Sequence, residues 1–129
     1  MIVVDASALV AIAQLEPDRR IYQEALAGTD AAYISPINYL ETGIVLIRRK
    51  LLADQARLDL WLASFRIELR EETELGVAAL EAYVRYGKGF HPARLNLADC
   101  FAYALAKQLD LPLLYKGDDF SKTDIKSAI

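Results

Sequence analysis

The chain opens with Ile2-Val3-Val4-Asp5-Ala6-Ser7-Ala8-Leu9, in which three apolar residues precede an acid and a helix-forming segment. A short, continuous apolar run is typical of a strand that is buried on both faces of a parallel sheet. The segment from Ala6 to Ala13 contains no helix breaker, which predicts a helix directly after this strand. A strand followed at once by a helix is the repeating unit of α/β proteins.

The remaining sequence continues this alternation. Pro17 suits the first position of a helix and Gly28 the position after its last turn, so they bracket a helix over 17–27. Ser35-Pro36 provides the N-cap and first position of a longer helix. We predict helices at 6–13, 17–27, 36–49, 53–65, 73–86 and 96–108, and strands at 2–4, 31–34, 66–69 and 111–115. This order indicates a three-layer α/β/α sandwich with a short central parallel sheet, formed by residues 1–129 as one domain.

Size and composition narrow the class of protein. The chain has 129 residues, a length that lets one domain bury a core without disulfides or a structural metal. Cys100 is the only cysteine and lies among apolar neighbours, so we interpret it as a buried hydrophobic residue rather than a nucleophile. The N-terminus lacks the basic segment of a signal peptide, and no apolar run approaches the ~20 residues of a membrane span. We therefore expect a cytoplasmic protein with no membrane partner.

The charge balance at first argues against nucleic acid as a partner, because the net charge is −3. Basic residues nevertheless cluster in two places, at Arg48-Arg49-Lys50 and across the segment that holds Arg85, Lys88, His91 and Arg94. Acids consumed in binding a cation would also bring the protein closer to neutrality. The local distribution of charge, rather than its sum, therefore decides which partners are possible.

Two acidic residues occupy informative positions in the first half of the chain. Asp5 ends the first predicted strand, at the sheet edge where α/β proteins bind ligands, although it also suits the N-cap of the next helix. Glu41 shares a helix face with Ile37, Ile44 and Val45, which predicts that its side chain points inward. A buried carboxylate without a partner costs roughly several kcal/mol, so it needs a basic residue or a cation. The alternative is that Glu41 reaches the surface at the edge of this face.

Two further acidic positions follow in the second half. Asp99 lies in the first turn of the helix at 96–108, where the helix dipole alone could explain it. Asp118 and Asp119 follow the last strand, in a Gly-Asp-Asp sequence that is also common in turns. If the backbone stays extended after Tyr115, Phe120 turns into the core and Asp119 points toward the cleft, with Asp118 on the opposite side. The alternative is that Gly117 breaks this alternation.

Taken together, these acids predict a metal site. Carboxylates ~4 Å apart repel by about 4 kcal/mol per pair at an effective dielectric of 20, so such a cluster persists around cations. No His or Cys stands at metal-ligand spacing, and oxygen-only ligation favours Mg²⁺ or Mn²⁺ over zinc. Mg²⁺ held by carboxylates suits phosphoryl transfer, in which the ion activates water and offsets developing charge.

The same residues carry a resemblance to a known family. The segments are Val3-Val4-Asp5-Ala6-Ser7-Ala8-Leu9, Ile37-Asn38-Tyr39-Leu40-Glu41, Tyr86 to Cys100, and Lys116-Gly117-Asp118-Asp119-Phe120. In order and spacing they closely resemble VapC-type PIN-domain toxins, over the whole chain. The one small departure is Ala6, where the family often has Thr.

The resemblance implies a Mg²⁺-dependent endoribonuclease that is the toxin of a type II toxin–antitoxin pair. The family's acidic quartet falls here on Asp5, Glu41, Asp99 and one of Asp118 and Asp119, and the family's Gly-x-Asp-Phe pattern favours Asp119. Ser7 matches the small polar residue beside the first acid and is a candidate for contact with substrate. The resemblance also implies an RNA substrate, a VapB-type antitoxin whose basic residues approach the acids, and a homodimer.

Other classes fit the sequence less well. A haloacid-dehalogenase-like phosphatase needs a second Asp two residues after the first, and Ser7 stands there. A response-regulator receiver needs paired acids after the first strand, where Ala6 stands instead. A non-catalytic PIN-like binding module remains possible and would be favoured if one of the acids were paired with Arg or Lys.

Two surface predictions complete the sequence-based account. Lys88 and Arg94, with Arg85 and His91, precede Asp99 in a loop expected near the carboxyl edge of the sheet, where binding residues are common. They are therefore candidates for binding RNA phosphates, or else solvated surface charges. The aromatic residues Tyr33, Tyr39, Trp61 and Phe65 exceed the needs of a small core. They predict a groove on the second to fourth helices that receives a helix of the antitoxin.

Overall fold

The computed structural model describes residues 1–129 and is organised around four parallel strands. Their order in the sheet is β3-β2-β1-β4, so the N-terminal strand lies in the interior of the sheet. Val3 pairs with Tyr33 of β2 on one side and with Leu113 of β4 on the other. The strands are β1 (Ile2–Val4), β2 (Ala32–Ile34), β3 (Ile67–Leu69) and β4 (Leu113–Leu114).

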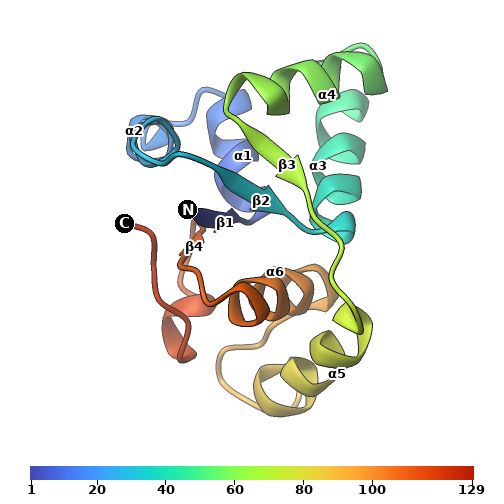
Figure 1. Cartoon of the computed structure of the whole chain (residues 1–129), viewed down its shortest axis with the longest axis vertical. Helices are drawn as coiled ribbons and strands as arrows, with labels where there is room; N and C mark the ends of the chain where they lie inside the picture. The colour runs from blue at the N-terminus through green and yellow to red at the C-terminus, as the bar shows by residue number, and fades with distance from the viewer.

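Helices cover both faces of this sheet (Figure 1). The connections contribute α1 (Ala6–Ala13), α2 (Arg19–Ala27), α3 (Pro36–Arg48), α4 (Gln55–Ser64), α5 (Leu75–Tyr86) and α6 (Leu97–Leu109), and a short 3-10 helix, η1 (Phe120–Lys122), follows β4. Helices α5 and α6 pack together on one side, while α1, α2 and α4 lie on the other. Helix α3 packs against α1 and α6 and so bridges the two layers.

Two apolar cores follow from the alternation of side chains along the strands. Val3 and Leu113 belong to the core under α5 and α6, whereas Val4 and Leu114 belong to the core under α1, α2 and α4. Cys100 is buried in the first of these cores, as its apolar neighbours predict. The three-layer α/β/α sandwich with a short parallel sheet is therefore confirmed. None of its helices is long and apolar enough to cross a membrane.

The predicted helix boundaries hold to within two residues, and the starts of α2, α4 and α5 each lie two residues later than predicted. Pro17 was expected at the first helical position, but α2 begins at Arg19 with Asp18 as its N-cap residue. The carboxylate of Asp18 does not cap the helix, because it binds Lys116 and the hydroxyl of Tyr22 instead. The contact with Lys116 joins residues that are 98 positions apart, so the local sequence does not reveal it.

The orientation of α3 corrects a second prediction. Glu41 was expected to share a core-facing stripe with Ile44, but Ile44 is 48% exposed and its neighbours Leu40 and Ile47 are also exposed. The face that packs against α1 and α6 instead carries Asn38, Thr42, Gly43 and Leu46. Glu41 lies between the two faces and is half-buried. The alternative, with Glu41 at the edge of an apolar stripe, is the one the structure supports.

Candidate active site

The site is built around Asp5, which directly follows β1 and is 4% exposed. Asp5 is the N-cap residue of α1. Its Oδ2 accepts hydrogen bonds from the Ser7 backbone N–H at 3.1 Å and from the Ser7 hydroxyl at 2.5 Å. The capping role and the position at the sheet edge are therefore compatible. Burial raises the pKa of Asp5 to about 6 despite these bonds, and the charge of Glu41 adds to the shift.

Asn38 connects Asp5 to the other elements of the site, a role that the sequence did not reveal. Its Nδ2 donates to Asp5 Oδ1 at 3.3 Å and to the Ala98 carbonyl at 3.1 Å. Its Oδ1 accepts from the hydroxyl of Ser35, the N-cap of α3. One buried amide thus joins the ends of β1, β2 and the first turn of α6. The available signal was an Asn inside a helix, where it is favourable only with a specific partner.

Asp99 is held in the first turn of α6 by a capping box. The backbone N–H of Asn96 donates to Asp99 Oδ2 at 3.0 Å, and the Asn96 side chain accepts from the Asp99 N–H at 2.9 Å. Burial, with smaller contributions from the charges of Asp5 and Asp119, raises the pKa of Asp99 to about 6 despite the bond from Asn96. Helix capping accounts for only one carboxylate oxygen, so the other is free for a ligand.

Electrostatic repulsion identifies the members of the acidic cluster. Burial is the largest cause of the raised pKa of Glu41, and the charge of Asp99 is the next. Glu41 in turn raises the pKa of Asp5, and Asp5 and Asp119 raise that of Asp99. Each of the four acids therefore acts on at least one other. We define Asp5, Glu41, Asp99 and Asp119 as the acidic cluster.

The loop after β4 does not have the extended backbone on which the choice between Asp118 and Asp119 was based. Gly117 adopts a φ of +104°, Asp119 is helical with φ −62° and ψ −49°, and η1 begins at Phe120. Strict alternation is therefore absent. Phe120 is nonetheless buried, and Asp119 is the acid of this pair whose charge acts on Asp99. Asp119 therefore stays the predicted fourth acid of the site, on a loop whose backbone differs from the expected one.

The donor set fits a hard divalent cation in chemistry, but the side chains are not drawn together. All four members of the cluster offer carboxylate oxygens, which Mg²⁺ and Mn²⁺ prefer. As they stand, no three His, Cys, Asp or Glu side chains are close enough to hold a metal ion. The metal site therefore stays a prediction, which rests on the chemistry of these four side chains.

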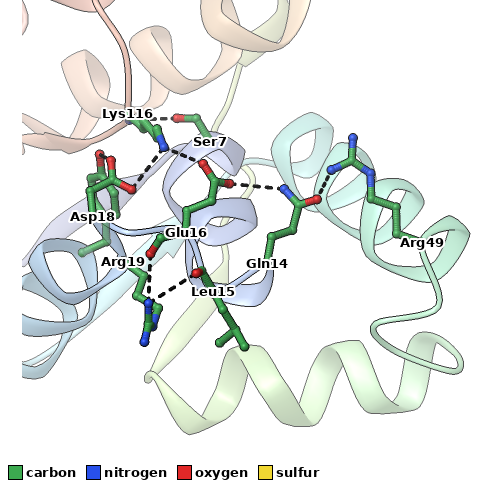
Figure 2. A network of polar contacts seen from close by, with 9 residues as sticks. Ser7, Gln14, Leu15, Glu16, Asp18, Arg19, Arg49 and Lys116 are labelled. Atoms are coloured by element: carbon green, nitrogen blue, oxygen red, sulfur yellow. Dashed lines mark hydrogen bonds and ion pairs between the residues drawn. The ribbon is translucent and has the colours of Figure 1, made fainter.

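Ser7 positions Asp5 through both its backbone N–H and its hydroxyl. Besides donating to Asp5, its hydroxyl accepts a hydrogen bond from the backbone N–H of Lys116 at 3.0 Å. Figure 2 shows this contact between α1 and the segment after β4. The second lone pair of the Ser7 hydroxyl has no partner, so contact with a substrate, which the sequence suggested, stays a prediction.

The basic residues before α6 divide into two groups. Lys88 and Arg94 are exposed and make no ion pair. Arg85 instead lies 3.7 Å from Asp124 and 4.8 Å from the centre of the Tyr86 ring. His91 accepts from the Ala93 N–H at 3.0 Å and packs edge-on against Tyr86. Only Lys88 and Arg94 therefore present side chains that are free for a phosphate.

Comparison with known proteins agrees with this architecture. The family profile described as PIN domain matches residues 2–126. The chain is 45% identical to "Ribonuclease VapC" of Mycolicibacterium smegmatis over 124 residues, which is 95% of this chain and 96% of the relative. It is 43% identical to "Ribonuclease VapC30" of Mycobacterium tuberculosis, covering 95% of each chain. The chain therefore belongs to the PIN-domain family, in its VapC ribonuclease branch.

Solved structures show the same fold at low sequence identity. Mycobacterium tuberculosis VapC20, described as a toxin that cleaves the sarcin-ricin loop, superposes with a TM-score of 0.76 at 18% identity, over 97% of this chain and 96% of that one. A toxin–antitoxin complex from Klebsiella pneumoniae gives a TM-score of 0.69 at 20% identity, over 96% and 93% of the two chains. At these identities the likeness concerns the fold alone.

Proposed function

We propose that the chain is a Mg²⁺-dependent endoribonuclease and the toxin of a VapBC-like toxin–antitoxin pair. The observation that carries this proposal is the acidic cluster, four carboxylates that repel one another at the carboxyl edge of a PIN-domain sheet. Its relatives are named as ribonucleases, which makes RNA the expected substrate. Mn²⁺ is expected to replace Mg²⁺, because both prefer oxygen ligands.

Two members of the cluster are held in place by hydrogen bonds and two are not. Asp5 is oriented by Ser7 and Asn38, and Asp99 by its capping box, so these two are the rigid ligands. Glu41 and Asp119 have no such bonds and complete the cluster by side-chain movement. A divalent cation bound there would supply water activation and would offset the charge that develops on the phosphate. The chain itself contributes the orientation of these oxygens and the exclusion of bulk water around Asp5.

The basic residues Lys88 and Arg94 are assigned to the RNA backbone. Both are exposed without ion-pair partners, in the loop that leads to Asp99. Phosphate contacts make affinity depend on salt, by a slope of about 0.9 or 0.7 per contact for double or single strands. Replacing both by Ala should therefore weaken RNA binding and flatten the salt dependence, and an unchanged slope would reject the assignment.

The antitoxin is assigned to a groove between α3 and α4. The groove has a volume of about 500 Å³ and is lined by Tyr39, Leu40, Gly43, Ile44, Ile47, Arg48, Gln55 and Leu58. Exposed Leu and Ile side chains along one helix are the surface that an amphipathic partner helix recognises. Of the four aromatic residues from which a groove was predicted, only Tyr39 lines this one, because Tyr33, Trp61 and Phe65 pack against the two apolar cores.

We assign the interface of a homodimer to the exposed apolar residues of α5 and the start of α6. Val77, Leu80, Val84 and Leu97 are each more than half exposed. Such a concentration of exposed apolar residues indicates an interface. Analytical ultracentrifugation is expected to show a dimer that Leu80→Glu dissociates, and a monomer at all concentrations would contradict this assignment.

The alternative functions are less well supported. A non-catalytic binding module would be favoured by an ion pair between a cluster acid and Arg or Lys, and none of the six ion pairs involves Asp5, Glu41, Asp99 or Asp119. A phosphatase of the haloacid-dehalogenase type would need an acid at residue 7. The hydroxyl of Ser7 instead binds Asp5 and the segment after β4.

Sequencing of RNA ends in cells tests the function. Cells that express the chain are expected to stop growing and to accumulate new RNA ends at a small set of sites. The Asp5→Ala variant, expressed to the same level, should produce neither effect. Co-expression of the neighbouring small gene product should restore growth. Harmless accumulation of folded, unaltered protein, with no new RNA ends, would contradict the proposal.

A further inference from the structure

A second charged cluster joins the segment after β4 to the loop between α1 and α2. The Nζ of Lys116 lies 2.5 Å from Glu16 Oε1 and 3.1 Å from Asp18 Oδ1. Glu16 also accepts from Gln14 Nε2 at 3.2 Å, and Gln14 accepts from Arg49 at the end of α3 (Figure 2). None of these groups belongs to the acidic cluster. Their arrangement therefore needs its own explanation.

The contacts of Lys116 differ from those of the other ion pairs. One ammonium group is shared by two carboxylates, and 36% of the side chain is exposed, the lowest value among the paired cations. A single exposed pair contributes little, because solvent screens it and the side chains lose freedom. Two partners and partial burial restrict Lys116 more strongly. The side chain thus fixes residue 116 to the loop between α1 and α2.

The backbone of Lys116 reaches the acidic cluster on both sides. Its N–H donates to the Ser7 hydroxyl, which donates to Asp5 Oδ2. The next residue, Gly117, has a φ of +104° that is costly for residues with a Cβ, and it begins the exposed loop that carries Asp119. At the far end of this loop, Phe120 is 2% exposed in the core. The loop is therefore held between Lys116 and Phe120.

We propose that Lys116 is a positioning residue for the divalent cation. Its bonds to Glu16 and Asp18 fix residue 116, which sets both the Ser7 hydroxyl that orients Asp5 and the start of the loop that presents Asp119. Lys116 does not contact the reacting atoms. The inference rests on the proposed cation-dependent function and adds to it a group outside the acidic cluster. Outer partners of metal ligands commonly change metal affinity by about 10–100-fold when removed.

Mn²⁺ binding to the purified chain, measured by electron paramagnetic resonance of the free ion at pH 7.5, tests the inference. Lys116→Met should weaken Mn²⁺ binding by about tenfold or more, with thermal unfolding showing a folded protein. Lys116→Arg keeps the charge and should restore most of the affinity. Lys122→Met is the matched control, because Lys122 is exposed, lies six residues further on and makes no ion pair. It should bind Mn²⁺ like the unaltered chain.

The outcomes separate this inference from its rivals. Unchanged Mn²⁺ affinity in Lys116→Met would overturn the positioning role of Lys116. If the KM for RNA rises while the Mn²⁺ affinity is unchanged, Lys116 binds phosphate and the inference is also overturned. If Lys116→Met does not fold, the double variant Glu16→Gln with Asp18→Asn decides. It leaves Lys116 in place and must also weaken Mn²⁺ binding, and unchanged affinity would overturn the inference. Failure of the unaltered chain to bind Mn²⁺ would instead contradict the proposed function itself.

Discussion

At the scale of single residues, Asn38 connects more of the site than any acid does. Its amide satisfies a buried oxygen of Asp5 and the Ala98 carbonyl at the same time. A buried acceptor without a donor costs about 1–3 kcal/mol, which is a large share of the stability of a small domain. The position was not identified from the sequence, because two of its three partners, Asp5 and Ala98, lie 33 and 60 residues away in the chain.

Substitution of Asn38 therefore affects both stability and Asp5. Asn38→Ala should lower the free energy of unfolding by about 1–3 kcal/mol and should reduce cleavage of RNA. Asn38→Asp keeps the size but places a second carboxylate beside Asp5, so it should destabilise more at pH 7.5 than at pH 5. Chemical denaturation at the two pH values measures both effects. Equal stability of Asn38→Asp and the unaltered chain at pH 7.5 would be incompatible with the buried contact.

The two neighbouring acids of the loop should differ in function. Asp119→Asn should reduce Mg²⁺-dependent cleavage more than Asp118→Asn, because the charge of Asp119 acts on Asp99. Both residues are exposed, so neither substitution should change the thermal midpoint appreciably. Cleavage rates at a series of Mg²⁺ concentrations measure the difference. A larger loss in Asp118→Asn would show that the loop is arranged differently around the cation.

At the scale of elements, the sequence predicts most of the fold because each helix and strand carries its own local pattern. The apolar run of β1, the Ser35-Pro36 start of α3 and Gly28 after α2 all appear as predicted. The orientation of α3 could not be predicted from its pattern. Large apolar side chains lie on its exposed face, and polar residues lie on the face that packs against the rest of the protein. The glycine at 117 left a break in the extended backbone open, and the structure shows the turn there with a φ of +104°.

Substitutions on the exposed and buried faces of α3 should separate antitoxin binding from the stability of the fold. Ile44→Glu should abolish binding of the antitoxin but leave the free energy of unfolding within about 0.5 kcal/mol, because Ile44 is half-exposed. Leu46→Ala, two residues away and fully buried, should instead cost about 2–5 kcal/mol. Calorimetric titration with the antitoxin and chemical denaturation separate the two effects. Tight binding by Ile44→Glu would place the antitoxin on another surface.

At the scale of the whole molecule, the acidic cluster should make the metal-free protein less stable as the pH rises. Asp5 and Asp99 have pKa values raised to about 6, from ordinary values of 3.8. Their protonated forms favour the folded state, so this contribution is complete below pH 3.8 and is lost as the pH rises through 6. Asp18 and Asp124 have lowered pKa values and act only in more acidic solution.

Thermal unfolding with EDTA should therefore show a lower midpoint at pH 7.5 than at pH 5. The expected loss is on the order of 1–3 kcal/mol, since one pKa unit corresponds to about 1.4 kcal/mol. Mg²⁺ binds the ionised acids, so it should restore stability at pH 7.5 and have little effect at pH 5. A midpoint that rises from pH 5 to pH 7.5 with EDTA would contradict the electrostatic description of the cluster.

The central claim is that the four acids bind the cation on which RNA cleavage depends. It is tested most directly by the rate of cleavage of a single-stranded RNA as a function of Mg²⁺ concentration, for the unaltered chain and for Asp99→Asn. The unaltered chain should show no cleavage with EDTA and a saturable dependence on Mg²⁺. Asp99→Asn removes a charged ligand while keeping its shape, so it should remain folded and lose cleavage by orders of magnitude. Full activity with EDTA, or an unchanged Mg²⁺ dependence in Asp99→Asn, would contradict the account.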